Sequence, residues 1–338
     1  MRRGMFVIAL MTAVLCVSSS PSYSLDRTYK IKRLVTQLYD KREAMDAQRQ
    51  LSGYGTEVTE FLMTALNDKG NERVRISALR IIADTGDSSV EDDVVAMLSD
   101  KSNRVRQEAA RTLSVIAKKQ SSVEPLKKLM SDFYPNVRYN AIKALAHLSP
   151  SDEDQLFVNS LGDYDPRVRM FAVIALGDLK AKEAVPYLAQ MIRDFDPNVR
   201  FQVVIALGKI GTPDCLQPLL MLMSDPELGI RRTAIDSLAQ LNVPGVEEQL
   251  LKATESADPK VVSRAIIALC DKKNDKAVEI AREQVSSEYM DVKLASITVL
   301  GKMGGKNEKP VLEELLNSES TNVRKQAKEA LDEVNSRT

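Results

Sequence analysis

The chain has 338 residues, of which 44% are apolar and only 5% aromatic, with no Trp. Lys and Arg number 47 and so do Asp and Glu, so the chain has no net positive charge that would concentrate nucleic acid around it. One His and three Cys are too few for the usual zinc, haem or iron–sulfur sites, which excludes most metalloenzyme chemistry.

Residues 1–24 have the pattern of a secretory signal peptide. Two arginines precede the apolar run 5–17, whose 13 residues fall short of a bilayer span. A spanning helix needs about 20 residues. Ser22 and Ser24 supply the small side chains of a cleavage site, so we expect the mature protein to begin at Leu25.

A lipoprotein would use Cys16, but Leu15 occupies the position where that processing needs Gly, Ala or Ser. Lipidation at Cys16 is therefore the less favoured alternative, and it stays open. We expect a periplasmic or secreted protein of a bacterial cell envelope that keeps no stable membrane span after cleavage. Without Arg2 and Arg3 the chain has 45 cations against 47 anions, which again argues against a nucleic-acid partner.

Residues 25–53 lack the repeat that follows, and we expect an N-terminal helical cap there. Residues 54–338 repeat in nine units with a period of 31 residues. Each unit has an aliphatic anchor, usually a small residue four positions later, and Leu or Ile eight positions later. These spacings lie on one face of a helix, and the small residue lets a neighbouring helix approach closely. The anchors are Val74, Val105, Val137, Val168, Val199, Ile230, Val261, Val292 and Val323.

A turn precedes each anchor helix, and it is clearest where Asp165 can cap the helix and Pro166 can occupy its first position. Upstream of each turn stands a second apolar stretch of about 11 residues, so each unit should form two antiparallel helices. A hairpin of this size cannot bury both of its faces, and its stability must come from stacking on its neighbours. The sequence therefore predicts an all-α array of about nine helical hairpins without a linker.

The segments VRMFAVIAL at 168–176 and VRFQVVIAL at 199–207 resemble the HEAT repeat, in particular the short bacterial form found in phycobilisome-lyase-type proteins. The resemblance covers residues 54–335. It implies a right-handed α-α superhelix, with the first helix of each hairpin on the convex surface and the second lining a concave surface where partners bind. It also implies an Arg directly after the anchor, and seven units match: Arg75, Arg106, Arg138, Arg169, Arg200, Arg231 and Arg324.

We interpret these arginines as structural, each tying its own helix to the carbonyls and carboxylates of the turn, rather than as an anion-binding column. Val262 and Lys293 depart from the motif. The turn Asp of the family matches at Asp165, Asp196 and Asp258 but not in the first units. We call a row of Asp–Arg ion pairs along the turns the Asp–Arg ladder, and we expect it to be discontinuous.

The residues that could carry chemistry are few. His147 stands where sister units carry charged or polar residues, which indicates a solvent-exposed side chain. Cys215 and Cys270 should lie at the start of an outer helix and at the end of the next inner helix. Packed helices are about 8–10 Å apart, which exceeds the roughly 7 Å that a disulfide tolerates between Cα atoms. We therefore expect two buried free thiols.

The acidic clusters at 91–93 and 152–154 fall in first turns of outer helices, where carboxylates interact favourably with the positive end of the helix dipole. We interpret them as helix caps rather than calcium ligands. The sequence has no phosphate-binding loop, nucleophile elbow or paired CxxC, and the glycines within 301–305 mark a helix end. We expect no catalytic, cofactor-binding or metal-ligating residues, and no cofactor.

Positions two and six after each anchor alternate with the core positions and should face the concave surface. They are mostly polar at both ends of the array and apolar in its middle. An exposed apolar surface marks an interaction site, whereas tight curvature would instead bury these side chains between adjacent helices. Both interpretations stay open. The predicted partner-binding residues are Tyr139, Met170, Ile174, Phe201 and Ile205.

Aromatic residues also recur along the turns. Phe133, Tyr164 and Phe195 each stand four residues before an anchor. We expect them to form a row along the turns of the array.

Together these features predict an exported, noncatalytic scaffold or adaptor that binds a protein, not nucleic acid. The alternative is a lyase-like or other enzyme accessory subunit acting on an exported substrate. Some proteins with similar repeats attach bilins, and another holds two irons through His-Glu motifs. A single His cannot supply those iron ligands, and a signal peptide is inconsistent with work on cytoplasmic antenna proteins.

Overall fold

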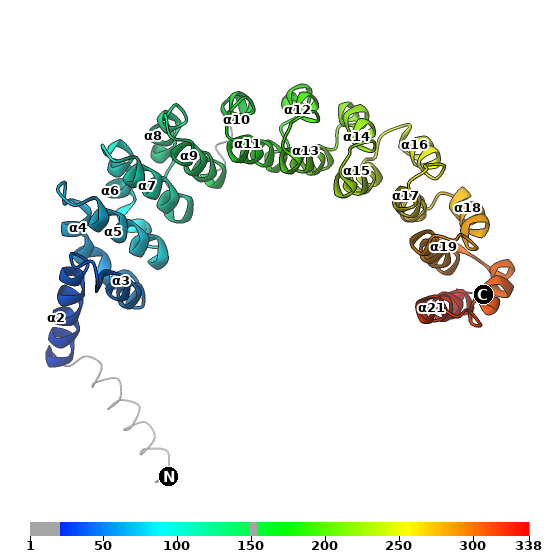
Figure 1. Cartoon of the computed structure of the whole chain (residues 1–338), viewed down its shortest axis with the longest axis horizontal. Coiled ribbons are helices and arrows are strands. Elements are labelled where there is room, and N and C mark those ends of the chain that lie inside the picture. Colours follow the sequence, from blue (N-terminus) through cyan, green and yellow to red (C-terminus); the bar gives the residue numbers. More distant parts are fainter. Residues whose placement is uncertain (1–20, 149–153, 338) are drawn as a thin grey trace, which may run out of the picture. The chain divides into compact units, whose positions relative to one another are not determined.

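The computed structural model describes residues 21–148 and 154–337. Within these residues the chain forms twenty α-helices and no β-strand, as the all-α prediction requires. The helices gather into two compact units, Met1–Pro150 and Ser151–Thr338 (Figure 1). The first 20 residues of the predicted signal peptide, including Cys16, lie outside the described residues. So do residues 149–153, across which the array was expected to continue without a linker.

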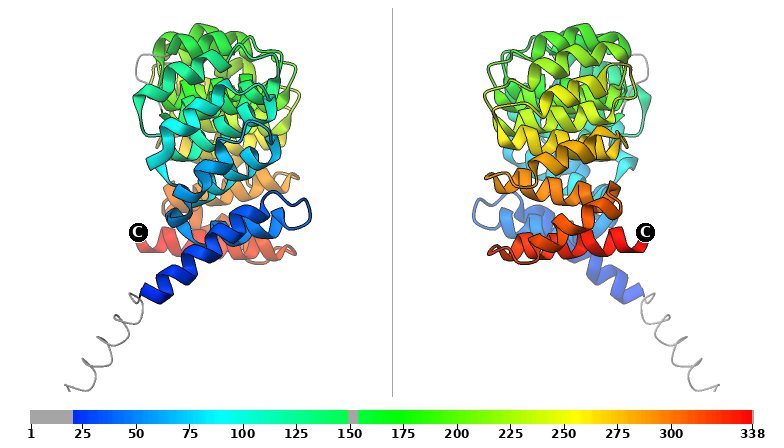
Figure 2. Two further views of the ribbon diagram at one scale, coloured as in Figure 1. Left: turned by 90° about the vertical axis from the view of Figure 1, so that its left-hand side faces the viewer. Right: turned by 90° about the vertical axis from the view of Figure 1, so that its right-hand side faces the viewer.

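Unit 1 begins with a helical pair and continues as three hairpins. Helix α2 packs on α3 and α4, and α3 lies beside α5, so the pair extends the stack of hairpins (Figure 2). The second helices of the hairpins lie side by side and form an inner layer, while the first helices form an outer layer. The helices are α2 (Pro21–Gln37), α3 (Ala44–Ser52), α4 (Thr59–Leu66), α5 (Glu72–Thr85), α6 (Glu91–Ala96), α7 (Asn103–Ile116), α8 (Val123–Leu129) and α9 (Pro135–Leu148).

Unit 2 consists of six hairpins with the same two layers. The inner helices have 13 to 17 residues, whereas the outer helices have only 7 to 9. The outer helices are α10 (Asp154–Ser160), α12 (Val185–Met191), α14 (Leu216–Leu222), α16 (Val246–Ala253), α18 (Lys276–Gln284) and α20 (Lys309–Leu315). The inner helices are α11 (Pro166–Asp178), α13 (Pro197–Ile210), α15 (Leu228–Gln240), α17 (Pro259–Asp271), α19 (Met290–Met303) and α21 (Thr321–Arg337). Over residues 21–148 and 154–337, the three hairpins of unit 1 and these six make the predicted nine.

The predicted core positions are buried. Every anchor residue and every residue four positions after an anchor is at most 3% exposed. The residues eight positions after the anchors are fully buried, apart from Leu331 in the last hairpin, which is half-buried. The repeat pattern therefore identifies the apolar side chains that join each inner helix to its outer helix and to its neighbours.

Two glycines allow inner helices of unit 2 to approach closely. A Cβ on Gly177 of α11 would lie 2.8 Å from the Cα of Ala206 on α13. A Cβ on Gly301 of α19 would lie 2.7 Å from the Cα of Ala330 on α21. Because the atoms in the way belong to backbone, a larger residue at either position must push two helices apart.

The Arg that follows the anchor links its own turn to the next turn. Nη1 of Arg169 donates to the carbonyl oxygens of Asp163 and Tyr164, while Nε and Nη2 donate to the carboxylate of Asp194 in the following hairpin. The hydrogen bonds to Asp194 raise the pKa of Arg169 although burial alone would lower it. The equivalent pairs are Arg75–Asp100, Arg106–Asp132, Arg200–Asp225 and Arg231–Asp258, with N···O distances of 2.7–2.9 Å.

The expectation of a discontinuous Asp–Arg ladder was wrong for the first hairpins. In unit 1 the ladder carboxylates belong to Asp100 and Asp132, which stand five residues before their anchors. Asp165 and Asp196 stand three residues before theirs and cap their own helices. Burial alone would raise the pKa of Asp132, but the hydrogen bond from Arg106 brings it below the ordinary value.

The Asp–Arg ladder ends before the last two hairpins, where the sequence lacks both the Arg after the anchor and the Asp of the following turn. Ser287 and Ser318 stand five residues before the last two anchors. The hairpins that precede these turns carry Val262 and Lys293 in place of the ladder Arg. At both turns the Arg and the Asp are absent together, so neither is left as an uncompensated charge. Arg324 of the last hairpin donates instead to the carbonyl oxygens of Ser318 and Glu319 in its own turn.

Candidate functional site

The five predicted partner-binding residues lie on inner helices and are all half-buried. Tyr139 lies on α9 in unit 1. Unit 2 brings the other four together on the neighbouring helices α11 and α13, and we call them the apolar patch. The apolar patch consists of Met170, Ile174, Phe201 and Ile205.

The turns and the close packing of two helices place the apolar patch. The carboxylates of Asp165 and Asp196 accept hydrogen bonds from the backbone N–H groups near the starts of α11 and α13, which fixes where both helices begin. The short approach at Gly177 then sets the two helices side by side. The corresponding positions on α15 hold Arg232 and Asp236, so the apolar patch ends at α13 and polar residues follow on the next inner helix.

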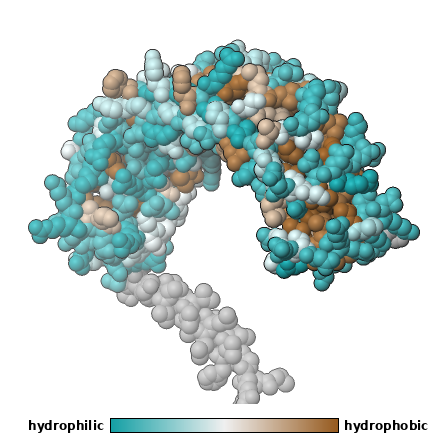
Figure 3. Space-filling view, turned by 45° about the vertical axis from the view of Figure 1, so that its right-hand side comes forward, coloured by the Kyte–Doolittle hydropathy of each residue, from teal (hydrophilic) through white to brown (hydrophobic). Residues whose placement is uncertain are grey.

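Partial burial of the patch has a simple cause. Positions two and six lie on the flank of each inner helix and partly contact the next inner helix, whereas positions four, seven and eight face inward. The side chains are thus neither sealed in the core nor fully exposed. Hydrophobic and polar residues also alternate over the surface of unit 2 that faces the viewer in Figure 3.

The predicted row of turn aromatics is exposed. Tyr164 and Phe195 of unit 2 are 97% and 101% exposed, and Phe133 of unit 1 is 86% exposed. Hydrogen bonds to the backbone fix the turns from which these rings project. The N–H of Asp196 donates to Oδ1 of Asp194, one residue on each side of Phe195. Because these rings are almost fully exposed, they have no role in the core of either unit.

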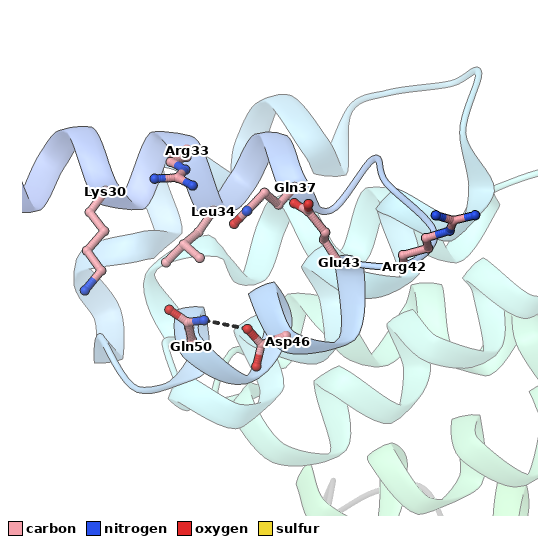
Figure 4. A pocket seen from close by; sticks show the side chains of 8 residues that line it. All are labelled: Lys30, Arg33, Leu34, Gln37, Arg42, Glu43, Asp46 and Gln50. Carbon is pink, nitrogen blue, oxygen red and sulfur yellow. Dashed lines mark hydrogen bonds between the residues drawn. The ribbon is translucent and has the colours of Figure 1, made fainter.

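One pocket was not predicted from the sequence. A hollow of about 450 Å³ lies between α2 and α3 of unit 1 (Figure 4). Lys30, Arg33 and Arg42 line it together with Glu43 and Asp46, and Gln50 donates a hydrogen bond to Asp46 at 2.7 Å. These exposed charges of both signs form a solvated polar hollow, and its lining contains no Ser, Thr, Cys or His.

The other candidate residues lie apart from one another. His147 is exposed in the last turn of α9, as expected. Cys215 and Cys270 are buried free thiols, and burial raises the pKa of the Cys270 thiol. Among the described residues, no three His, Cys, Asp or Glu side chains gather as a metal site would require. In the same part of the chain, no helix is long and apolar enough to cross a membrane.

The acidic cluster at 91–93 does more than cap its helix. Glu91 begins α6 as expected, but its carboxylate is fully buried and binds the following hairpin rather than its own helix. It accepts hydrogen bonds from the backbone N–H groups of Lys118 and Lys119 and from Oγ of Ser122, at 2.5–3.1 Å. Of the second cluster, Asp154 begins α10, while residues 152 and 153 lie outside the described residues.

Comparisons with known proteins agree with this architecture. The family model for HEAT repeats matches residues 59–146, 123–195, 153–239 and 246–332. A search of curated protein sequences found no match. An engineered protein of known structure is 20% identical and has a TM-score of 0.50, over 90% of this chain and 99% of its own. The E. coli protein YibA is also 20% identical, with a TM-score of 0.46, over 86% of this chain and 96% of its own. The similarity to the engineered protein, at 20% identity, shows the fold alone.

Proposed function

The chain belongs to the HEAT-repeat family, and from this premise we propose that it is a noncatalytic protein-binding scaffold or adaptor. Proteins built from HEAT repeats generally serve as protein-interaction scaffolds. We place the partner on the inner-helix face, meaning the side of the inner layer that points away from the outer helices.

The apolar patch of unit 2 carries the proposal. Four apolar side chains occupy adjacent surface positions on α11 and α13, where a soluble array would ordinarily place polar residues. Aromatic residues and Met are enriched in protein–protein interfaces, and both types are present in the patch. A partner that covers the patch would complete the burial of side chains that the fold leaves half-exposed.

A charge placed in the apolar patch should abolish partner capture. We expect Phe201→Asp and Met170→Asp to lose the partner that wild-type protein captures after crosslinking in intact cells. Their helicity and melting temperature should stay almost unchanged, because both side chains are only half-buried and an Asp at either position can reach water. Partners are identified by mass spectrometry, and stability is followed by circular dichroism.

The matched control replaces an exposed aromatic residue of the same hairpin on its outer helix. Tyr187 on α12 is 45% exposed, and Tyr187→Asp should capture the partner as wild type does. The proposal fails if Tyr187→Asp loses capture equally. It also fails if Phe201→Asp and Met170→Asp unfold the protein by several kcal/mol, as charges forced into a core do.

We further propose that the protein works in the periplasm or is secreted. The support is the N-terminal pattern of two arginines, an apolar run of 13 residues and the small residues Ser22 and Ser24. Protein isolated from its host should begin near Leu25 when its N-terminus is sequenced. Full-length protein recovered from the cytosol would contradict this localisation.

A further inference from the structure

We propose that unit 1 carries a paired-arginine site on its inner-helix face, which binds the carboxylates of an acidic protein segment. We name the site by its residues, Arg80, Glu108, Arg111 and Lys143. The proposal rests on the proposed function, because it takes the inner-helix face as a protein-binding surface. It adds the chemistry of the partner, which the apolar patch of unit 2 leaves unspecified.

One buried carboxylate holds two arginines side by side. The Glu108 side chain is only 6% exposed. Its Oε2 accepts a hydrogen bond from Nε of Arg80 at 3.2 Å, and its Oε1 accepts one from Nε of Arg111. Arg80 lies on α5, whereas Glu108 and Arg111 lie on α7, so the cluster also joins two neighbouring inner helices.

The outer edges of both guanidiniums remain available. The side chains of Arg80 and Arg111 are 48% and 38% exposed, and their Nη atoms make no hydrogen bond to any other described residue. A guanidinium carries five donors in a planar fork. Because Glu108 binds through the Nε atoms, each arginine keeps its Nη1–Nη2 edge free for a bidentate bond to a carboxylate.

The cluster carries more positive charge than a structural role requires. Neutralising Glu108 needs one arginine, and here it has two. Lys143 adds another cation at the same repeat offset on α9, which packs beside α7, and it is exposed. The four side chains therefore sum to a charge of +2. The same offset in unit 2 holds residues such as Ile174 and Asp236, so the cationic site belongs to unit 1.

The spacing of the cations indicates the form of the ligand. Neighbouring packed helices lie about 8–10 Å apart. An extended chain advances about 3.3–3.6 Å per residue, so acidic residues three positions apart can reach from the arginine pair to Lys143. We therefore assign the site to an extended segment with Asp or Glu at about every third position.

The test is binding of a synthetic peptide to the full-length protein, measured by fluorescence anisotropy. The probe is a short fluorescein-labelled peptide with Glu at every third position, separated by Ser and Gly, and its matched control carries Gln in place of Glu. We expect the Glu peptide to bind, binding to weaken as salt rises, and the Gln peptide not to bind. Arg111→Gln should weaken binding about tenfold, the loss typical of a hydrogen bond to a charged group.

Two variants separate binding from folding. Lys143→Gln leaves the Arg80–Glu108–Arg111 cluster intact and should weaken binding about threefold, as loss of an exposed ion pair does. Lys128→Gln makes the same change of charge on the outer helix α8, where the side chain is exposed, and should bind the peptide as wild type does. The triple variant Arg80→Gln, Glu108→Gln and Arg111→Gln leaves no uncompensated buried charge and should lose binding.

The proposal is overturned if the Glu peptide does not bind, or if the Glu and Gln peptides bind equally. It is also overturned if Lys128→Gln and Lys143→Gln lose the same affinity for the peptide, or if a folded triple variant binds it as wild type does. Binding of a phosphoserine peptide without binding of the Glu peptide would also overturn it, in favour of a phosphate site. Phe201→Asp should leave peptide binding unchanged, so failure of this site can be distinguished from failure of the apolar patch.

Discussion

Replacing Arg200 with Ala should lower the free energy of unfolding by about 3–5 kcal/mol, the usual cost of removing one partner from a buried ion pair. Arg200 donates through Nε and Nη2 to the carboxylate of Asp225 at 2.7 and 3.1 Å. Through Nη1 it also donates to the carbonyl oxygen of Asp194. The Asp225 side chain is only 4% exposed, so the substitution leaves a buried carboxylate without its cation. Urea denaturation followed by circular dichroism measures the loss.

Two controls identify the cause. Arg193→Ala removes an exposed arginine in the turn just before α13 and should leave stability close to that of wild type. The double variant Arg200→Ala with Asp225→Asn removes the unpaired charge and should recover part of the loss. The ladder would not be a stabilising element if Arg200→Ala unfolded at the same urea concentration as Arg193→Ala.

Glu91→Ala should destabilise unit 1 by about 3–5 kcal/mol, because three donors lose their acceptor at once. The donors are the backbone N–H groups of Lys118 and Lys119 and the buried hydroxyl of Ser122. Glu91→Gln keeps one carbonyl acceptor and should lie between Glu91→Ala and wild type. Thermal and urea unfolding of the purified proteins measure this order of stability.

The neighbouring Asp92 provides a matched control for Glu91. Its carboxylate is largely exposed and pairs with the side chain of Lys119 at 2.6 Å. Exposed ion pairs contribute little to stability, so Asp92→Ala should unfold close to wild type. Equal effects of Glu91→Ala and Asp92→Ala would mean that the acidic cluster acts only on its own helix, as the sequence had suggested.

Much of the fold could be predicted because its signals are local. Anchors such as Val168 and Val199 recur every 31 residues, and each is followed by the spacings of one helical face. Asp165 and Pro166 mark a helix start through their own backbone preferences. The helical hairpins therefore follow from pattern alone.

The cross-hairpin polar contacts could not be predicted from local patterns. Arg200 and Asp225 are 25 residues apart, and Glu91 and Ser122 are 31 apart, so only the stacked turns bring them together. A signal did exist in the aligned repeats, since Asp recurs five residues before several anchors, and where Ser256 takes that position, Asp258 supplies the carboxylate that binds Arg231.

The candidate site was only partly predictable. Position within the repeat identified Met170 and Phe201 as surface residues of the inner helices. How much of each side chain is exposed depends on how closely the next inner helix packs, and that distance is set by small residues such as Gly177 and Ala206. The exposure of Tyr164 and Phe195 likewise follows from turn geometry rather than from residue type.

The central claim is that the inner-helix face binds a protein. Its most direct test is site-specific photocrosslinking from two positions of one hairpin. A photoreactive residue is placed at Ile205 on α13 or at Tyr187 on α12, and intact host cells are irradiated. We expect a discrete crosslinked partner from position 205 and not from position 187, and its yield should fall when Met170→Asp is added. The same products from both positions, or none from position 205, would contradict the claim.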